Sequence, residues 1–191
     1  MSEPLANATE LVLQLIEALD AAGVQYMLVG SYSSNYYGRP RSTKDADFVV
    51  QIDAKQLTSV AQRLGQEFQL DRQMTFETVT MTVRYIINHP LTAFKIELFL
   101  LSDDDHDKER FRRKQKAMFE GRSVWLPTAE DVIITKLRWS RAGARAKDAG
   151  DVAGILAVQR NSLDLDYIRH WLDRHGTREL FEPLLVATSR Q

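Results

Sequence analysis

The chain of 191 residues contains no cysteine, which excludes disulfide bonds, thiolate metal sites and a cysteine nucleophile. It also lacks an apolar run of the roughly 20 residues that a membrane span needs. No basic segment followed by an apolar core marks a signal peptide at the start of the sequence. Positive and negative charges nearly cancel, with a formal net charge of −1, so overall charge gives no argument for nucleic-acid binding. We therefore expect a cytoplasmic protein without a membrane partner.

The hydrophobic content of 44% is ordinary for a globular protein, and the length suits one domain or a core with a helical appendage. Helical and strand-like patterns alternate along the chain, which indicates the α/β (α+β) class. Helices are expected near 8–22, 33–37, 54–68, from 103 onwards, from 128 onwards and within 163–187. Strands are expected at 24–29, 44–52, 77–85 and 94–100.

The most informative segment is a Gly-Ser turn followed by two carboxylates. Gly30 and Ser31 follow an apolar strand-like run, and after thirteen intervening residues come Asp45 and then Asp47. Alternate side chains of a strand share a face, so these two acids are expected about 6.5–7 Å apart on one face. Two acids beside a turn that presents backbone N–H groups can hold a divalent metal and a triphosphate together. The alternative is a surface strand with two solvated acids.

The pattern Val29-Gly30-Ser31, a spacer, and then Asp45-Ala46-Asp47-Phe48 resembles the active-site motif of the DNA polymerase β-like nucleotidyltransferase superfamily. The resemblance spans 29–49, about a tenth of the chain. It implies a core made of a mixed β-sheet flanked by helices, with a C-terminal helical region. It also implies a third acid on a later strand, and Glu97 is the acid inside the expected strand 94–100. The alternative is a solvated Glu97 paired with Lys95.

The chemistry implied by the resemblance uses two Mg²⁺ ions, with Mn²⁺ as an alternative, because two metals can bridge the attacking and leaving oxygens. Asp45, Asp47 and Glu97 are the candidate catalytic and metal-binding residues. An NTP is the implied substrate, with its phosphates held at the Gly-Ser turn. The candidate nucleotide-binding residues are Gly30, Ser31, Arg39, Arg41, Lys44 and Lys136. For the three residues next to the aspartates, Arg39, Arg41 and Lys44, simple loop solvation is the alternative.

A basic stretch stands out in the C-terminal third, with five Lys or Arg residues in the twelve positions 136–147 and no acid between Asp131 and Asp148. Arg141, Arg145 and Lys147 are the candidate contacts to an acceptor. The alternative is a solvated basic face that pairs with nearby acids. The region resembles the helical part of nucleotidyltransferases related to AbiE-type toxins. The matching residues are Pro127, Thr128, Glu130, Asp131, Lys136, Leu137, Arg145, Lys147, Asp148 and Asp151.

The acidic block at 103–107 is interpreted as the start of a helix, where acids suit the helix dipole. Basic residues further on, Arg110, Arg113 and Lys114, are weaker candidates for a nucleic-acid contact. The four histidines show no convincing metal-ligand spacing and are interpreted as surface or loop residues; they are His89, His106, His170 and His175.

Together these patterns predict a catalytic core at 1–125 and a helical region at 126–191. The predicted function is metal-dependent transfer of NMP from an NTP to an acceptor hydroxyl on RNA (tRNA) or protein. The resemblance adds a bacterial toxin role, with a cognate antitoxin as partner. Two alternatives remain: a non-catalytic nucleotide-binding protein of the same fold, and an enzyme that modifies a small molecule such as an antibiotic. No motif in the sequence selects a particular base.

Overall fold

A computed structural model describes residues 8–66, 68–71, 73–90, 92–143 and 146–188. Its main sheet has the strand order β1-β2-β6-β5-β3, and β4 also pairs with β5. β2 and β6 are parallel, whereas the other neighbours in this sheet are antiparallel, so the expected mixed sheet is confirmed. The strands are β1 (Gln25–Val29), β2 (Asp45–Gln51), β3 (Gln69–Leu70), β4 (Thr75–Glu77), β5 (Thr82–Asn88) and β6 (Lys95–Leu100).

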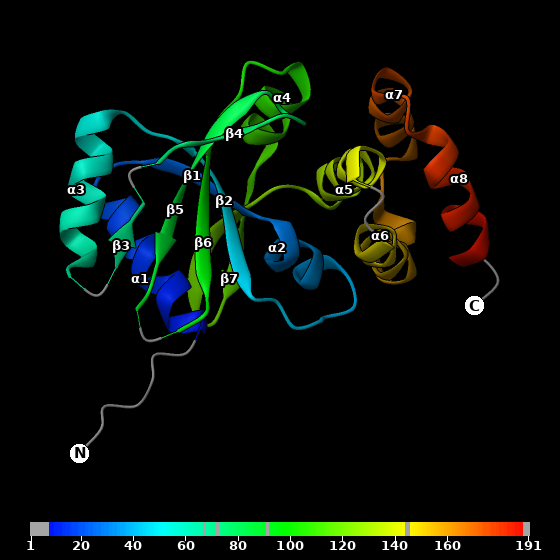
Figure 1. Cartoon of the computed structure of the whole chain (residues 1–191). Coiled ribbons are helices and arrows are strands. Elements are labelled where there is room, and N and C mark those ends of the chain that lie inside the picture. Colours follow the sequence, from blue (N-terminus) through cyan, green and yellow to red (C-terminus); the bar gives the residue numbers. More distant parts are fainter. Residues whose placement is uncertain (1–7, 67, 72, 91, 144–145, 189–191) are drawn as a thin grey trace.

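Two helices, α1 (Ala8–Ala21) and α3 (Ala54–Leu64), lie on one side of this sheet (Figure 1). Apolar residues of α1 recur every three or four positions, which gives the helix one continuous buried stripe. The stripe packs against the strand side chains that alternate toward it, among them Phe48 and Leu98, both fully buried. This packing forms the larger hydrophobic core and fixes which face of β2 is left for polar residues.

The opposite face of the sheet carries a smaller apolar cluster. Met27, Val49 and Phe99 pack there against Phe111 of α4 (Asp105–Arg113). Asp45 and Asp47 share this face with Val49, because residues two apart in a strand point the same way. The acids therefore continue an apolar surface at one end of the strands.

The chain ends in helices α5 (Ala129–Gly143), α6 (Ala146–Gln159), α7 (Leu165–His175) and α8 (Arg178–Ala187), with a short 3₁₀ turn at Arg160–Ser162. They form a C-terminal helical region with its own apolar core. Helix α2 (Gly30–Tyr37) lies between the sheet and this region (Figure 1). A Cβ added at Gly38 would come within 2.8 Å of the Ile155 backbone nitrogen, so the end of α2 touches the backbone of α6. The division into domains at 125/126 stays a prediction.

Three of the expected elements are wrong in extent. The strand expected at 77–85 is interrupted by a turn at 78–81, where Met81 has a φ of 55° and the Glu77 carboxylate accepts from the Thr80 backbone N–H at 2.8 Å. The helix expected to reach 68 ends at Leu64, because Gly65 adopts a φ of 74°.

The charged segment after 103 is also not one long helix. Helix α4 ends at Arg113, and a hairpin of β7 (Gln115–Phe119) and β8 (Arg122–Leu126) follows. The hairpin turns at Glu120 and Gly121, which both have positive φ. Its strands pack beside β1 through Ala117 and Val124 in the larger core. Among the described helices, none is long and apolar enough to cross a membrane.

Candidate active site

The three expected acids meet at one edge of the parallel pair β2–β6. The strand register pairs Asp47 directly with Glu97 and places Asp45 two residues earlier, opposite Lys95. Neighbouring strands lie about 4.7–4.9 Å apart, so the Asp47 and Glu97 backbones are adjacent. All three acids line a pocket of about 250 Å³.

Asp45 and Glu97 each have a side-chain partner beside the pocket. Thr43 donates its hydroxyl hydrogen to Asp45 Oδ1 at 2.8 Å. Arg84 Nη1 lies 2.8 Å from Glu97 Oε2, so the partner of Glu97 is an arginine across the β5–β6 pair. The Arg84 guanidinium also lies 5.7 Å from the centre of the Phe99 ring and lines the pocket. Sequence reasoning missed Arg84, because it read this segment only as an alternating strand.

The Gly-Ser turn abuts the acids. Gly30 has a φ of 63°, and a Cβ built on it would lie 1.9 Å from Asp47 Oδ2. Val29 pairs with Asp47 in the β1–β2 register, which explains the approach. Helix α2 begins at Gly30, so the first N–H groups of a helix and the partial positive charge of its dipole lie beside the carboxylates. This combination suits a phosphate group bridged to a metal ion.

Ser31 is connected to the helical region through Arg41. Arg41 Nη2 donates to Ser31 Oγ at 2.9 Å. The same guanidinium binds Asp151 of α6 through Nε at 2.7 Å and Nη2 at 2.9 Å. Ser34 of α2 also donates its hydroxyl hydrogen to Asp151, at 3.2 Å. A single carboxylate of α6 therefore fixes both the loop after α2 and the helix itself.

Lys136 of α5 belongs to the same network. Its Nζ lies 2.7 Å from Asp151 Oδ2 and 3.2 Å from Asp148 Oδ1. The residue is 7% exposed and lines the pocket. Burial alone would raise the pKa of Asp151, but the hydrogen bonds from Arg41 and Lys136 outweigh it and lower that pKa to about 2. Asp151 therefore stays ionised and holds both cations at neutral pH.

The other basic candidates are not gathered in one place. Lys147 lines the pocket. Arg39 and Lys44 are exposed and do not line it. Arg141 instead donates to the backbone carbonyls of His175 and Gly176 and so joins α5 to the end of α7. Arg145 lies outside the described residues.

Two of the weaker candidates for a nucleic-acid contact, Arg110 and Arg113, also have partners within the protein. Arg110 is 5% exposed and donates to Asp107 at 2.7 Å. Arg113 lies 3.3 Å from Asp131 and 3.9 Å from the centre of the Tyr167 ring. The contacts of Arg113 hold the end of α4 against α5 and α7, whereas the Arg110–Asp107 pair lies within α4.

The interpretation of the four histidines as surface or loop residues is wrong for His106, which is buried within helix α4, whereas His89 lies in the loop after β5 and His170 is exposed. His89 and His106 are 6% and 1% exposed. His106 also lies next to His175, with ring centres 5.2 Å apart. Wide separation in the sequence, 69 positions, hid this proximity, because it arises from the packing of α7 against α4.

The donor set of the pocket indicates what it can hold. Asp45, Asp47 and Glu97 offer only oxygen ligands, which Mg²⁺ and Mn²⁺ prefer. Lys136, Lys147 and the start of α2 supply positive charge on the same pocket. The arrangement therefore fits divalent metal ions together with the phosphates of a nucleotide.

Comparison with known proteins shows the fold. No protein-family model matches this chain, and no match was found among curated proteins. Solved structures do match. ANT(2″)-Ia in complex with adenylyl-2″-tobramycin has a TM-score of 0.62 at 10% identity, covering 90% of this chain and 98% of that one. An antigenic nucleotidyltransferase-like protein from Paracoccidioides brasiliensis has a TM-score of 0.54 at 15% identity, covering 97% and 94%.

A third match is the lincosamide antibiotic adenylyltransferase LnuA with lincomycin bound, with a TM-score of 0.52 at 11% identity, covering 78% of this chain and 96% of that one. The chain thus has the fold of the DNA polymerase β-like nucleotidyltransferases, as its motif predicts. These similarities do not distinguish the AbiE-type group, which stays a prediction.

Proposed function

We propose that this protein is a divalent-metal-dependent nucleotidyltransferase that moves NMP from an NTP to an acceptor hydroxyl. The observation that carries the proposal is the strand register, which sets Asp47 beside Glu97 while Gly30 at the start of α2 touches the Asp47 carboxylate. Metal ligands and a phosphate-binding helix start are therefore parts of one pocket.

Asp45, Asp47 and Glu97 would hold two Mg²⁺ ions, which neutralise charge on the triphosphate and activate the acceptor hydroxyl. The backbone at Gly30 and Ser31 would bind phosphate oxygens. Lys136 keeps hydrogen-bonding capacity for the leaving pyrophosphate, because its ammonium group has three donors and two point to Asp148 and Asp151.

Arg84 is an additional candidate for the reaction. A carboxylate accepts several hydrogen bonds, so Glu97 can bind a metal ion through one oxygen and keep Arg84 on the other. Arg84 would then hold the Glu97 side chain in position. It would also add positive charge on the side of the pocket where Glu97 lies, which we take as the acceptor side.

The pairing of basic side chains in the helical region bears on the choice of acceptor. RNA binding depends on several free Lys or Arg side chains that neutralise phosphates. Of the basic stretch, Lys136 and Arg141 already have internal partners, and Arg138 donates to Asp104 at 3.0 Å. These contacts favour a small-molecule hydroxyl, with a protein hydroxyl next and tRNA last. The fold shared with antibiotic adenylyltransferases supports the same order by analogy only.

The toxin role and a cognate antitoxin remain predictions from the resemblance of the helical region. They require a macromolecular acceptor, so identifying the acceptor tests them. Each α-labelled NTP is incubated with the protein and Mg²⁺ in the presence of total tRNA, a cell lysate or an aminoglycoside and lincosamide panel. The labelled product then identifies both the nucleotide and the acceptor.

Turnover itself is tested with Asp47→Asn, which keeps the size of the side chain and removes its charge. We expect pyrophosphate release to fall by at least about a thousandfold, because one residue would ligate both metal ions. Asp166→Asn, an exposed acid on α7, is the matched control and should keep full activity. NTP binding without release of pyrophosphate from the NTP, whichever acceptor is present, would support the non-catalytic alternative. Equal activity of the Asp47→Asn protein would refute the proposed site.

A further inference from the structure

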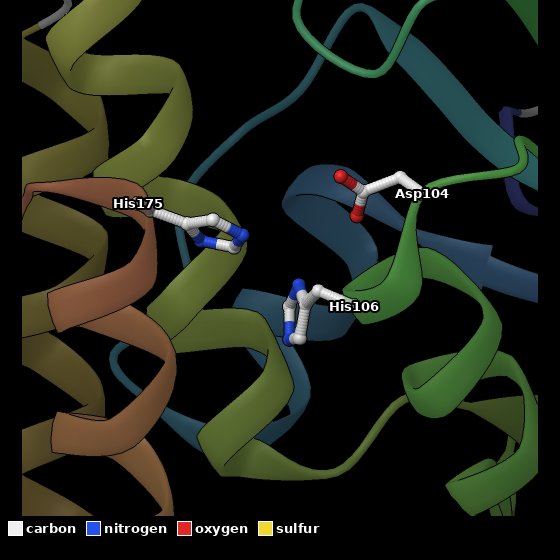
Figure 2. Close-up of side chains that lie close together, drawn as sticks. All are labelled: Asp104, His106 and His175. Carbon is white, nitrogen blue, oxygen red and sulfur yellow. The ribbon is translucent and has the colours of Figure 1, made fainter.

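A second group of ligating side chains lies away from the pocket acids. Figure 2 shows Asp104, at the start of α4, with His106 of the same helix and His175 at the end of α7, their polar ends directed toward one another. One ligand atom from each lies within 4.8 Å of the others. Within the described part of the chain, this is the group of three or more such residues that comes close enough to hold a metal ion.

The His106 ring is fixed in a way that favours metal binding. Its Nε2 lies 3.2 Å from Asp131 Oδ1, and Asp131 is itself held by the Thr128 hydroxyl at 2.9 Å and the Tyr167 hydroxyl at 2.7 Å. A carboxylate that accepts from one ring nitrogen leaves the other nitrogen as an acceptor and raises its basicity. The second nitrogen of His106, Nδ1, is thereby available to a metal ion.

His175 supplies a second nitrogen ligand. Its Nδ1 is buried and makes no hydrogen bond to the described residues. The ring packs beside Trp171 and His106, with ring centres 6.0 Å and 5.2 Å away. Figure 2 shows the other ring nitrogen, Nε2, at the end of the ring that faces Asp104 and His106, so Nε2 is the atom placed to bind a metal ion.

Asp104 carries the negative charge of the group but shares it with Arg138. Arg138 binds both carboxylate oxygens, Nη1 to Oδ1 at 2.9 Å and Nη2 to Oδ2 at 3.0 Å. The Asp107 backbone N–H also donates to Oδ1, so Oδ2 has the more open coordination. A carboxylate offers about four lone-pair directions, which leaves room on Oδ2 for a metal ion beside Arg138.

We propose that Asp104, His106 and His175 form a transition-metal site, for an ion such as Zn²⁺, that joins α4 to α7. Two imidazoles and one carboxylate suit Zn²⁺, Co²⁺ or Ni²⁺ rather than Mg²⁺. Bonds of about 2.0–2.1 Å place tetrahedral ligands roughly 3.4 Å apart, so ligand atoms that lie within 4.8 Å of one another need to close by at most about 1.4 Å. Water would complete the coordination.

The site would act as a clamp between the sheet and the helical region. Helices α4 and α7 already contact each other through the exposed ion pair of Arg174 with Asp105, at 2.7 Å, and through Trp171 and His106, with ring centres 4.9 Å apart. A bound ion would add a bond between the same two helices. The proposed metal site does not depend on the proposed nucleotidyl transfer, since none of its three ligand residues lines the pocket.

The test uses the full chain after treatment with a chelator. Isothermal titration with Zn²⁺ should show one saturable site, and Co²⁺ should give visible d–d absorption that saturates at one equivalent. An excess of about a hundredfold over the Kd should raise the Tm by about 5–10 °C. His175→Ala should lose all three signals, whereas His170→Ala, which removes an exposed histidine of the same helix, should keep them.

Wild-type protein that binds no Zn²⁺ at one equivalent, or a His175→Ala protein that binds it unchanged, would overturn the proposal. If His175→Ala does not fold, Asp104→Asn is titrated in its place, and unchanged binding would again overturn it. A His175→Ala protein that loses the Zn²⁺ signals but keeps Mg²⁺-dependent pyrophosphate release would show that the metal site and the pocket act independently. Failure of pyrophosphate release with Zn²⁺ binding intact would count against the proposed function alone.

Discussion

Asp151 is the side chain through which the helical region holds the residues around the Gly-Ser turn. Its carboxylate binds Arg41 and Lys136, and its side chain is 4% exposed. Asp151→Asn keeps the shape and removes the charge, leaving two cations with one carboxylate fewer between them. We expect a folded protein of lower stability in which the Ser31 hydroxyl is held less firmly by Arg41.

The size of this loss follows from the pKa of Asp151. A shift from 3.8 to about 2 corresponds to about 2.5 kcal/mol at 1.36 kcal/mol per pKa unit. Removing one partner of a buried ion pair costs about 3–5 kcal/mol, but the Arg41 side chain is 33% exposed and can be partly rehydrated. We therefore expect a loss of about 2–3 kcal/mol at pH 7 and a Tm lower by about 4–12 °C.

The pH dependence gives a sharper signature. The folded pKa lies below the unfolded value, so this carboxylate contributes its full stabilisation above pH 3.8 and loses it as the pH falls through about 2. The difference between wild type and Asp151→Asn should thus be constant from pH 7 to pH 5. It should fall to roughly half by pH 3.

Urea unfolding at these three pH values measures the effect. Glu182→Gln is the matched control, because Glu182 also contacts two arginines, Arg169 and Arg178, but has a side chain that is 38% exposed. Such exposed pairs contribute about 0–1 kcal/mol, so the control should change little. A loss below about 1 kcal/mol for Asp151→Asn at pH 7, or an undiminished difference at pH 3, would refute the reasoning.

Three further predictions address the pocket and its rim. Gly30→Ala should abolish transfer, because its Cβ would lie 1.9 Å from a pocket carboxylate; Gly65→Ala, with the same positive φ but nothing within 4 Å, should lose only about 1 kcal/mol in urea unfolding and keep its activity. Equal activities would contradict this. Arg84→Ala should lower kcat more than it weakens NTP binding, and calorimetry with a non-hydrolysable NTP that shows lost binding would argue against its place on the acceptor side. Arg141→Ala should destabilise the protein by about 1–2 kcal/mol and leave the salt dependence of acceptor binding unchanged. A flattened salt slope would restore Arg141 as an acceptor contact.

The centre of the pocket could be predicted because it depends on local rules. Asp45 and Asp47 were expected on one strand face, and β2 presents both away from the larger core. Glu97 was expected on the face opposite Ile96 and Leu98, and the structure has that alternation. The alternation of side chains along a strand can be predicted from the strand's own sequence, without information on residues that are distant in the chain. Whether these acids bind metal and catalyse transfer stays a prediction.

Two hairpins escaped prediction because their turns gave weak or overlooked signals. The turn at 78–81 has no glycine or proline, and alternating threonines carried the strand pattern through it. It is stabilised by the Glu77 side chain, which a period count cannot detect. The Glu120-Gly121 turn did carry a signal, but the preceding basic residues favoured a longer helix. A glycine preceded by a residue with positive φ is a turn signal that outweighs the charge pattern at this point of the chain.

The long-range pairs could not be predicted from the sequence. Arg41 and Asp151 are separated by 110 positions, and the contact exists only because α6 packs against α2. The alternative in which acids pair with the basic stretch is confirmed for Lys136 with Asp148 and Asp151. The part of that alternative that places the basic residues on a solvated face is wrong for Lys136, because this residue is only 7% exposed.

The position of α2 has a consequence for anyone who would divide this chain. Tyr37, at its end, belongs to the apolar core of the helical region, and its hydroxyl donates to the Pro127 carbonyl at 2.8 Å. A fragment cut at the linker between β8 and α5 would carry that tyrosine away from its core and expose it to water. Each piece would therefore expose apolar surface that the intact chain buries, which makes this linker a poor place to seek a minimal catalytic unit.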